Sequence, residues 1–224
     1  MKIIARIYTD FKEKFGIPRQ SGITDMARGR VVFEPEFRVA EALRGIEGYS
    51  HLWLIWEFSE SKRDTWSPTV RPPRLGGNKR MGVFATRSPY RPNPIGLSSV
   101  RLLGVEQTAK EGTVLIVGGA DMLDGTPIYD IKPYLSFTDS HPDALCGFAD
   151  GVRDYSLEVR ISDEHLAVVD EGLRESLKIL LSGDPRPSYK GDGDAEYGLR
   201  FGDYEVKFKV CDGVLYVTDI FPVG

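Results

Sequence analysis

The sequence predicts an α+β protein that is mostly β, and two observations support this fold class. In the first two thirds, short segments rich in β-branched and aromatic residues are separated by turn residues. Few helical patterns lie between them, which favours a barrel or a curled mixed sheet over a doubly wound parallel sheet. The last third changes to an amphipathic helix followed by a hairpin, which predicts a small α+β unit.

The strand segments of the first two thirds are recognised by composition and by alternation. The pattern YSHLWLIWEF places Leu52, Leu54, Trp56 and Phe58 on one face, as expected for a strand with one well-buried side. One helix is expected to interrupt the strands, starting at Pro35 and ending before Gly45. The predicted strands are residues 2–9, 30–34, 49–58, 82–86, 96–105 and 113–118.

The last third begins with a helical pattern over residues 163–181. Apolar residues recur there at helical spacing, although Gly172 weakens the middle. A polar, turn-rich connector covers residues 182–198. Strands are expected at 204–210 and 214–221, because Asp212–Gly213 between two alternating runs is a strong hairpin signal. A domain boundary is expected within residues 152–162.

The segment 61–100 concentrates positive charge on a shaped loop. It carries eight Lys or Arg against one acid, a local charge of +7 in a chain of net charge −4. Six prolines and four glycines restrict regular structure there. A cationic patch on an otherwise acidic protein indicates a polyanion partner such as RNA. The alternative is a basic loop that serves solubility alone.

Composition and motifs exclude several classes of protein. No apolar run reaches the roughly 20 residues of a membrane span, and the N-terminus is a poor secretory signal. Two cysteines make no disulfide framework, so the cytoplasm is the default location. The three histidines are scattered without ligand spacing, and no metal site is predicted. The run GGADMLDGTP lacks the spacing of a Rossmann glycine motif, and no P-loop is present.

Several segments resemble the TrmO (TsaA) family of S-adenosylmethionine-dependent tRNA methyltransferases. The run GVFATRSPYRPNPIGLS is long and compositionally unusual, which makes chance agreement implausible. The matching segments are EKFGIPRQSG (13–22), SHLWLIWEF (50–58), the stretch 66–98, DMLDGTPIYDIKPYL (121–135) and DPRPSY (184–189).

The resemblance implies a fold, a reaction and partners. The expected fold is an N-terminal, cofactor-binding single-sheet β-barrel over residues 1–155, unlike the usual methyltransferase sheet, and a small α+β domain over 156–224. The expected reaction transfers a methyl group from S-adenosylmethionine to the exocyclic amine of threonylcarbamoyladenosine at position 37 of certain threonine tRNAs. A homodimer with cofactor sites near the subunit interface is also implied.

Cofactor-binding residues are carried over position by position from the family motifs. At 59–60 the family pattern is His-Gln, so the Ser-Glu found here leaves backbone contacts as the expectation. The cofactor carboxylate needs a cationic partner, for which Arg19 and Arg87 are candidates. The expected cofactor-binding residues are Pro18, Arg19, Gln20, Ser59, Glu60, Arg87, Leu97, Asp124, Gly125, Thr126 and Pro127.

The DPRPSY motif carries the expected catalytic residues Asp184, Pro185 and Tyr189. An adenine amine is a weak nucleophile, and a hydrogen-bond acceptor on its N–H would free the lone pair. The Asp184 carboxylate and the Pro185 carbonyl are candidates for this acceptor. The alternative is that Asp184 caps a turn after the helix, because Asp-Pro is first of all a turn signal.

Substrate contacts are expected mainly from the basic segment. Arg91 and Arg186 are candidates for reading the threonyl carboxylate, because arginine binds carboxylates in a bidentate manner. Trp66 and Tyr90 are candidates for base stacking, with plain packing as the alternative. Two other functions stay open, a non-catalytic RNA-binding barrel and a small-molecule methyltransferase. The expected substrate-binding or RNA-binding residues are Arg71, Arg74, Lys79, Arg80, Tyr90, Arg91 and Arg186.

Overall fold

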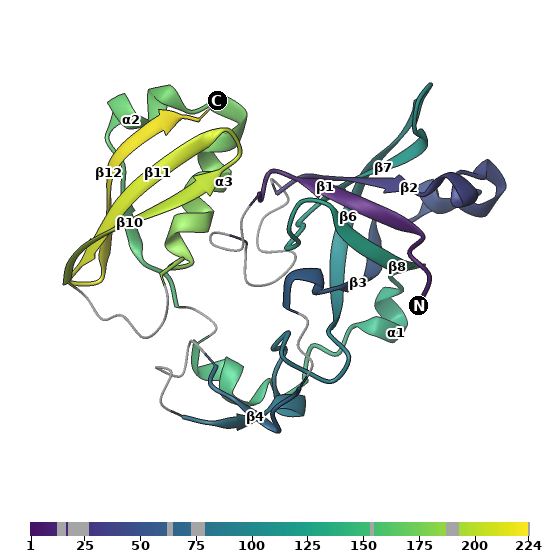
Figure 1. Cartoon of the computed structure of the whole chain (residues 1–224), viewed down its shortest axis with the longest axis horizontal. Helices are drawn as coiled ribbons and strands as arrows, with labels where there is room; N and C mark the ends of the chain where they lie inside the picture. Colours follow the sequence, from purple (N-terminus) through teal and green to yellow (C-terminus); the bar gives the residue numbers. More distant parts are fainter. Residues whose placement is uncertain are drawn as a thin grey trace.

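The computed structural model describes residues 1–12, 17, 27–61, 65–72, 79–152, 155–186 and 193–223. Its strands form two main sheets, one within residues 5–133 and the other within residues 158–222, together with a two-stranded ribbon. Figure 1 shows the two sheets as separate units, with the ribbon of β4 projecting below them. Within the described ranges, no helix is long and apolar enough to cross a membrane.

The first unit is a closed ring of six strands in the order β1-β2-β7-β6-β3-β8. Each strand pairs antiparallel with both neighbours, so no strand of the ring has a free edge. The strands are β1 (Ala5–Thr9), β2 (Gly29–Phe33), β3 (His51–Glu57), β6 (Ile95–Thr108), β7 (Gly112–Gly118) and β8 (Thr126–Pro133).

The alternation predicted for β3 is confirmed. Leu52 and Leu54 are fully buried and Trp56 nearly so, whereas the intervening side chains are partly exposed. These inward side chains join others from the remaining strands in one apolar cluster that fills the ring. Burial of this cluster is the main driving force for closure of the ring.

Two predicted elements of the first unit are wrong. The helix expected after Pro35 is instead three short 3₁₀ turns, η1 (Pro35–Phe37), η2 (Ala40–Leu43) and η3 (Ile46–Gly48), because Val39 is extended and none of the three turns has a buried residue. The strand expected at 82–86 is limited to β5 (Met81–Gly82), which pairs with β4 (Thr69–Val70) and runs into the turn η6 (Val83–Ala85).

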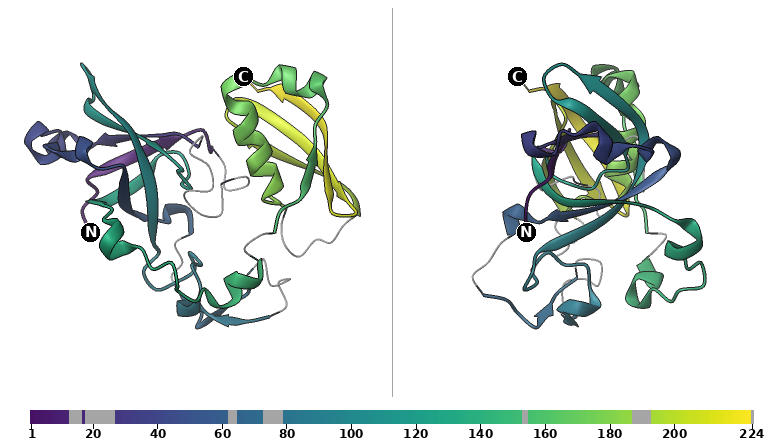
Figure 2. Two further views of the ribbon diagram at one scale, coloured as in Figure 1. Left: turned by 180° about the vertical axis from the view of Figure 1, so that it is seen from behind. Right: turned by 90° about the vertical axis from the view of Figure 1, so that its right-hand side faces the viewer.

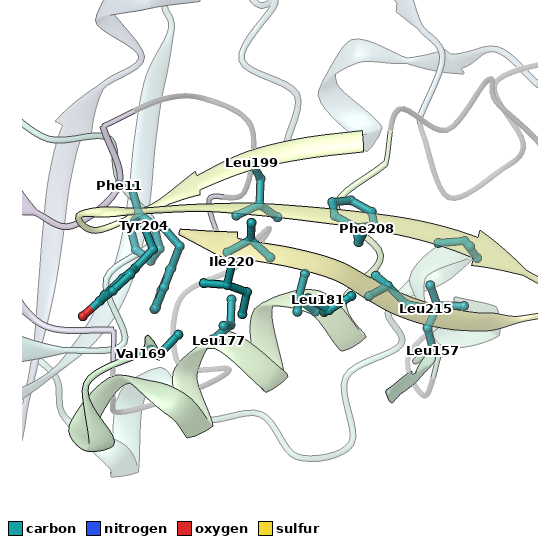
Figure 3. Packing of buried hydrophobic residues seen from close by; sticks show 14 of the residues in the cluster. Phe11, Leu157, Val169, Leu177, Leu181, Leu199, Tyr204, Phe208, Leu215 and Ile220 are labelled. Carbon is teal, nitrogen blue, oxygen red and sulfur yellow. The ribbon is translucent and has the colours of Figure 1, made fainter. Parts of the chain in front are cut away.

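The second unit is a four-stranded sheet covered on one face by two helices. Its strand order is β10-β11-β12-β9, in which β9 alone runs parallel to its neighbour. Figure 3 shows α3 lying across the sheet, with Leu177 and Leu181 directed at Phe208, Leu215 and Ile220. The elements are β9 (Glu158–Arg160), α2 (Asp163–Val168), α3 (Glu171–Ser182), β10 (Gly193–Phe201), β11 (Tyr204–Cys211) and β12 (Val214–Pro222).

The sequence predicts this unit with three differences, the first of which is strand β9, which was not expected. The single helix expected over 163–181 is broken after α2, because buried Val169 adopts an extended conformation (φ −89°, ψ 135°). Strand β10 begins inside the segment expected to be a connector. The hairpin is confirmed, since Asp212 and Gly213 have φ of 50° and 76°, as a type I′ turn requires.

An exposed segment leads from β8 to β9 and contains α1 (Ser136–Asp139) and η7 (Gly147–Val152). Its start is fixed by the Trp53 indole N–H, which donates to Asp139 Oδ2 at 2.8 Å. Phe137 and Leu145 are 85% and 95% exposed. Figure 2 shows this segment running beneath both units to reach the second one.

Candidate active site at one rim of the ring

The strand pairing brings most of the expected cofactor-binding positions to one rim of the ring. At this rim β1, β3 and β7 end, whereas β2, β6 and β8 begin. Residues 59–60 follow β3, and Leu97 is the third residue of β6. Residues 124–125 precede β8, and residues 126–127 are its first two residues. Segments that are far apart in the sequence are therefore neighbours at the rim.

A chain of side-chain hydrogen bonds lies inside the ring beneath this rim, and we call it the floor of the rim. The Trp56 indole N–H donates to Ser98 Oγ at 2.9 Å, and the Ser98 hydroxyl donates to Asp121 Oδ1 at 2.6 Å. Trp56 and Ser98 are buried. The chain links β3, β6 and the segment after β7, so it fixes the three strand ends relative to one another.

Gly96 allows the Trp56 indole to lie against the backbone of β6. A Cβ at this position would lie 2.5 Å from Cδ2 and Cζ2 of Trp56, and closer still to Cε2. No side chain larger than hydrogen fits there without moving the indole. The close approach explains a glycine inside a strand.

The turn before β8 places backbone groups at the rim. Thr126 N–H donates to Leu123 O at 3.2 Å, and Gly125 has φ of 74°. The DGTP sequence predicts a type I or I′ turn in which Gly125 takes a positive φ. The positive φ of Gly125 is confirmed, but Asp124 has no positive φ, so the turn has the φ pattern of type II.

The Asp124 carboxylate organises this turn. Its Oδ1 accepts the Thr9 N–H at 2.9 Å and its Oδ2 accepts Lys12 Nζ at 2.8 Å. A Cβ on Gly125 would meet no atom within 4 Å, so the backbone of the turn faces open space. The backbone groups of the turn are engaged as well, because the Asp124 and Gly125 N–H groups donate to Phe11 O and Ile7 O at 2.8 and 2.9 Å and the Gly125 carbonyl accepts from Arg6 Nη1 at 3.1 Å. What the turn offers a ligand is therefore the open surface beside Gly125.

The other described cofactor candidates differ in exposure. Leu97 projects outward and is 54% exposed. Ser59 and Glu60 form the turn η4 (Ser59–Ser61), held to β3 by the Ser61 N–H, which donates to Phe58 O at 2.9 Å. Arg87 is exposed in the segment that leads into β6.

The basic candidates lie on the β4–β5 ribbon and on the loop after it. Arg71, Lys79 and Arg80 are exposed around the ribbon, where Arg80 Nη1 donates to Thr69 Oγ1 at 3.3 Å. Arg91 holds its own loop, because its Nη1 donates to the Thr86 and Ser88 carbonyls at 3.1 and 3.4 Å. Tyr90 beside it is 42% exposed.

The aromatic candidate Trp66 lies on the same part of the chain. Its ring centroid is 6.0 Å from that of Phe84, and both side chains are exposed. The pair therefore offers an apolar face next to the exposed cations of the ribbon. Such a face can stack on bases or cover another protein surface.

Asp184 and Arg186 form a buried ion pair in the second unit. Arg186 Nε donates to Asp184 Oδ1 at 2.8 Å and its Nη2 donates to Oδ2 at 2.9 Å, with side chains only 8% and 15% exposed. The Tyr155 hydroxyl also donates to Oδ2 at 2.9 Å. Asp184 has φ of 53° and directly follows α3, which matches the interpretation as a turn residue.

The surroundings of Asp184 favour its ionised form. Burial would raise the pKa of this carboxyl, but the hydrogen bonds from Arg186 and Tyr155 and the charge of Arg186 outweigh it, so the pKa lies below its ordinary value. Burial and the bond to Asp184 raise the pKa of Tyr155. Because both Asp184 oxygens accept hydrogen bonds, the carboxylate is a weak candidate for taking a proton from a substrate.

Five expected site residues lie outside the described residues: Pro18, Arg19, Gln20, Arg74 and Tyr189. Their roles stay predictions. Sequence reasoning passed over Ser98, Asp121, Thr9 and Lys12, whose short-range patterns are unremarkable and which meet only through strand pairing. It also missed Tyr129, whose pKa is raised to about 12 by burial and by its hydrogen bond to Glu57.

Two sequence families match the chain. The tRNA-methyltransferase O N-terminal domain matches residues 6–140, and the TrmO C-terminal domain matches residues 154–223. A tRNA (adenine(37)-N6)-methyltransferase of Escherichia coli (strain K12) is 40% identical over 227 residues, which cover 98% of this chain and 96% of that protein. A Pseudomonas aeruginosa protein bearing the name of an S-adenosylmethionine-dependent methyltransferase, RcsF, is 42% identical over 210 residues, covering 91% and 89% of the two chains.

A solved structure agrees with these matches. The crystal structure of TrmO from Pseudomonas aeruginosa superposes with a TM-score of 0.75 at 34% identity, covering 98% of this chain and 97% of that one. The ring, the second unit and the rim described above are thus shared across nearly the whole length of the molecule. The chain belongs to the TrmO family.

Proposed function

We propose that the protein is an S-adenosylmethionine-dependent tRNA (adenine37-N6)-methyltransferase whose cofactor site is the rim of the ring. The observation that carries this proposal is the gathering of residues 59–60, Leu97 and 124–127 at one rim by strand pairing. The names of the Escherichia coli and Pseudomonas aeruginosa relatives support the reaction and the methyl donor.

The rim has features that fit this cofactor. The backbone of the turn at 124–127 faces open space, and the exposed Leu97 offers an aliphatic surface for an adenine ring. When bound, S-adenosylmethionine supplies a methyl group activated by a sulfonium. In our proposal Arg87, with Arg19 as the alternative, pairs with its carboxylate. Backbone groups of residues 59–60 and the open surface of the turn beside Gly125 contact its adenosine.

Catalysis in this proposal depends mainly on alignment. Methyl transfer is an in-line displacement, so holding the amine and the methyl donor at a fixed angle and distance lowers much of the barrier. The Trp56–Ser98–Asp121 chain keeps the floor of the rim rigid, which preserves that alignment. Exclusion of water by the bound tRNA would complete the site.

The substrate amine needs a hydrogen-bond acceptor, and we place it at the DPRPSY motif. Since the Asp184 carboxylate is engaged by Arg186 and Tyr155, we propose that Asp184 positions the motif and that the Pro185 carbonyl accepts the amine hydrogen. Tyr189 completes the motif. The guanidinium of Arg186 is committed to Asp184, so of the two candidates for reading a threonyl carboxylate we retain Arg91.

We further propose that the substrate is threonylcarbamoyladenosine in threonine tRNA, modified in the cytoplasm by a homodimer. Support for the dimer comes from large apolar side chains that are exposed on the segments around the ribbon and between the two units. These are Trp66, Phe84, Phe137 and Leu145.

A labelling experiment tests the reaction. The purified protein is incubated with methyl-deuterated S-adenosylmethionine and threonine tRNA, with or without the threonylcarbamoyl group, and the digested nucleosides are analysed by mass spectrometry. We expect label in the threonylcarbamoylated nucleoside alone. Label in a small molecule instead, or bound tRNA with no label, would favour the small-molecule enzyme or the non-catalytic RNA-binding protein.

Removing the charges of the ribbon should weaken tRNA binding in a salt-dependent way. For the triple variant Arg71→Ala, Lys79→Ala, Arg80→Ala, we expect the slope of log K against log salt to fall by about 2–3, because each phosphate contact contributes about 0.7–0.9. Affinity for S-adenosylmethionine should stay unchanged.

Filter binding from 50 to 300 mM salt measures this slope. The matched control replaces Lys110, Lys178 and Lys209, three lysines outside the basic segment, with alanine. Equal slopes for the two triple variants would rule out the ribbon as the tRNA-binding surface.

A further inference from the structure

Phe11 belongs to the chain of the ring but is buried in the core of the second unit. It follows β1 by two residues, and its side chain is 4% exposed within the cluster that α3, β10, β11 and β12 form. Figure 3 shows its ring beside Tyr204 at one end of this cluster. Ala27 is buried in the same cluster and Ile17 packs against it. The connection between β1 and β2 is thus held by the second unit at three points.

Hydrogen bonds tie the same place to the rim. The Gly202 N–H donates to Asp10 O at 3.2 Å, and the Asp124 N–H donates to Phe11 O at 2.8 Å. Lys12 and Thr9 bind the Asp124 carboxylate from either side of Phe11. At the far end of the connection, the Ala120 N–H donates to Ala27 O at 3.0 Å. Phe11 therefore lies between the second unit and the turn at 124–127.

Three carboxylates lie near the contact between the β1–β2 connection and the second unit, and their mutual repulsion disfavours this contact. Asp10, Asp124 and Asp203 lie close enough to influence one another, and burial together with the two other carboxylates raises the pKa of Asp10 against the opposing effect of Lys12. Charges of one sign on both sides of a contact disfavour it. The apolar insertion of Phe11 is what opposes this repulsion.

We propose that Phe11 is a positioning residue through which the second unit holds the rim in its cofactor-binding arrangement. This inference rests on the proposed cofactor site at the rim. Phe11 does not belong to the apolar cluster that fills the ring, so the ring does not need it for its own core. Its effect on the cofactor is exerted through the turn at 124–127, whose Asp124 N–H donates to Phe11 O.

The test compares two deletions of apolar volume from the same core. Phe11→Ala removes the insertion, whereas Leu215→Ala removes a fully buried side chain from β12, a strand of the second unit that has no place in the ring. Affinity for S-adenosylmethionine is measured by calorimetry at a temperature where circular dichroism shows both variants folded. We expect a tenfold or greater loss of affinity for Phe11→Ala and less than a twofold change for Leu215→Ala.

One further variant and one kinetic measurement extend the test. Phe11→Leu restores apolar volume and should recover most of the affinity. In kinetics, Phe11→Ala should raise KM for S-adenosylmethionine while kcat is largely retained, which general destabilisation would not produce. Equal affinities for Phe11→Ala and Leu215→Ala would overturn the inference.

Arg87→Ala separates this inference from the proposed site. If Arg87→Ala weakens binding and Phe11→Ala does not, the rim binds the cofactor without help from Phe11 and the inference fails alone. If neither Phe11→Ala nor Arg87→Ala changes the affinity, and Arg19→Ala does not change it either, the cofactor site proposed at the rim fails as well. Amide exchange of Asp124 in the ligand-free protein supports the inference only if it is faster in Phe11→Ala than in Leu215→Ala, because the Asp124 N–H is bonded to Phe11 O.

Discussion

Arg186→Ala is expected to lower the free energy of unfolding by about 3–5 kcal/mol, because it leaves the Asp184 carboxylate buried without its bidentate partner. Urea unfolding followed by circular dichroism measures the change. Arg160→Ala is the matched control. Arg160 also pairs with a carboxylate two residues away, at 2.8 Å, but both side chains are 59% exposed, so little or no loss of stability is expected.

The same ion pair predicts a pH dependence. The pKa of Asp184 in the folded protein lies below its ordinary value of 3.8, so its stabilisation is complete above that pH. It is lost as the pH falls through the lower, folded-state value. The stability contributed by this pair should therefore not vary between pH 5 and 7. A loss that began near pH 6 would contradict the assignment.

Gly96→Ala is expected to destabilise the ring strongly and to remove most methyl transfer. The added methyl group would lie inside contact distance of the Trp56 indole, which must tilt and give up its bond to Ser98. Overpacking of this kind costs about 1–3 kcal/mol, and the lost hydrogen bond between buried groups adds about 1 kcal/mol or more. For a chain of this length, about 3 kcal/mol corresponds to a Tm lower by roughly 6–12 °C.

Gly104→Ala controls for the effect of alanine on strand β6. A Cβ at Gly104 meets no atom within 4 Å, so this variant should be neutral or more stable by up to about 1 kcal/mol. Calorimetry measures the Tm of both variants, and tRNA methylation is assayed at a temperature where both are folded. Together these measurements test whether the effect is specific to Gly96. If the two variants melt together, the contact between Gly96 and Trp56 does not restrict this position.

Five of the six ring strands were predictable because each carries its own signal, whereas β8 was not among the predicted strands. Alternation over 50–58 and the β-branched content of 113–118 identify β3 and β7 without knowledge of their neighbours. The helix expected after Pro35 failed for a physical reason. Its start and stop signals were present, but Phe37 and Leu43 pack only partly against the ring cluster and no residue of the three turns is buried, whereas short helices depend on such burial. The break between α2 and α3 has a different cause, because it results from burial of the Val169 side chain.

The candidate site was predictable only where a motif is local. The DGTP turn and the GVFATRSPYRPNPIGLS run can be recognised by their letters, and the positive φ of Gly125 follows from the turn. The partners of Asp124 cannot be recognised in this way, since Thr9 and Lys12 are more than 110 residues away. The commitment of Asp184 to Arg186 also depends on burial, which the spacing of the motif does not reveal.

The position of Phe11 has a consequence for the order in which this protein matures. Strand β1 can pair with β8 once residues 126–128 have left the ribosome. The Phe11 side chain can be buried only after residues 199–220, which form much of the core around it, have followed. Long sequence separations of this kind delay the last contacts of folding. A partly synthesised chain can therefore close its ring before its second core exists. If Phe11 positions the rim as we propose, the rim reaches its cofactor-binding arrangement only after the second unit has folded.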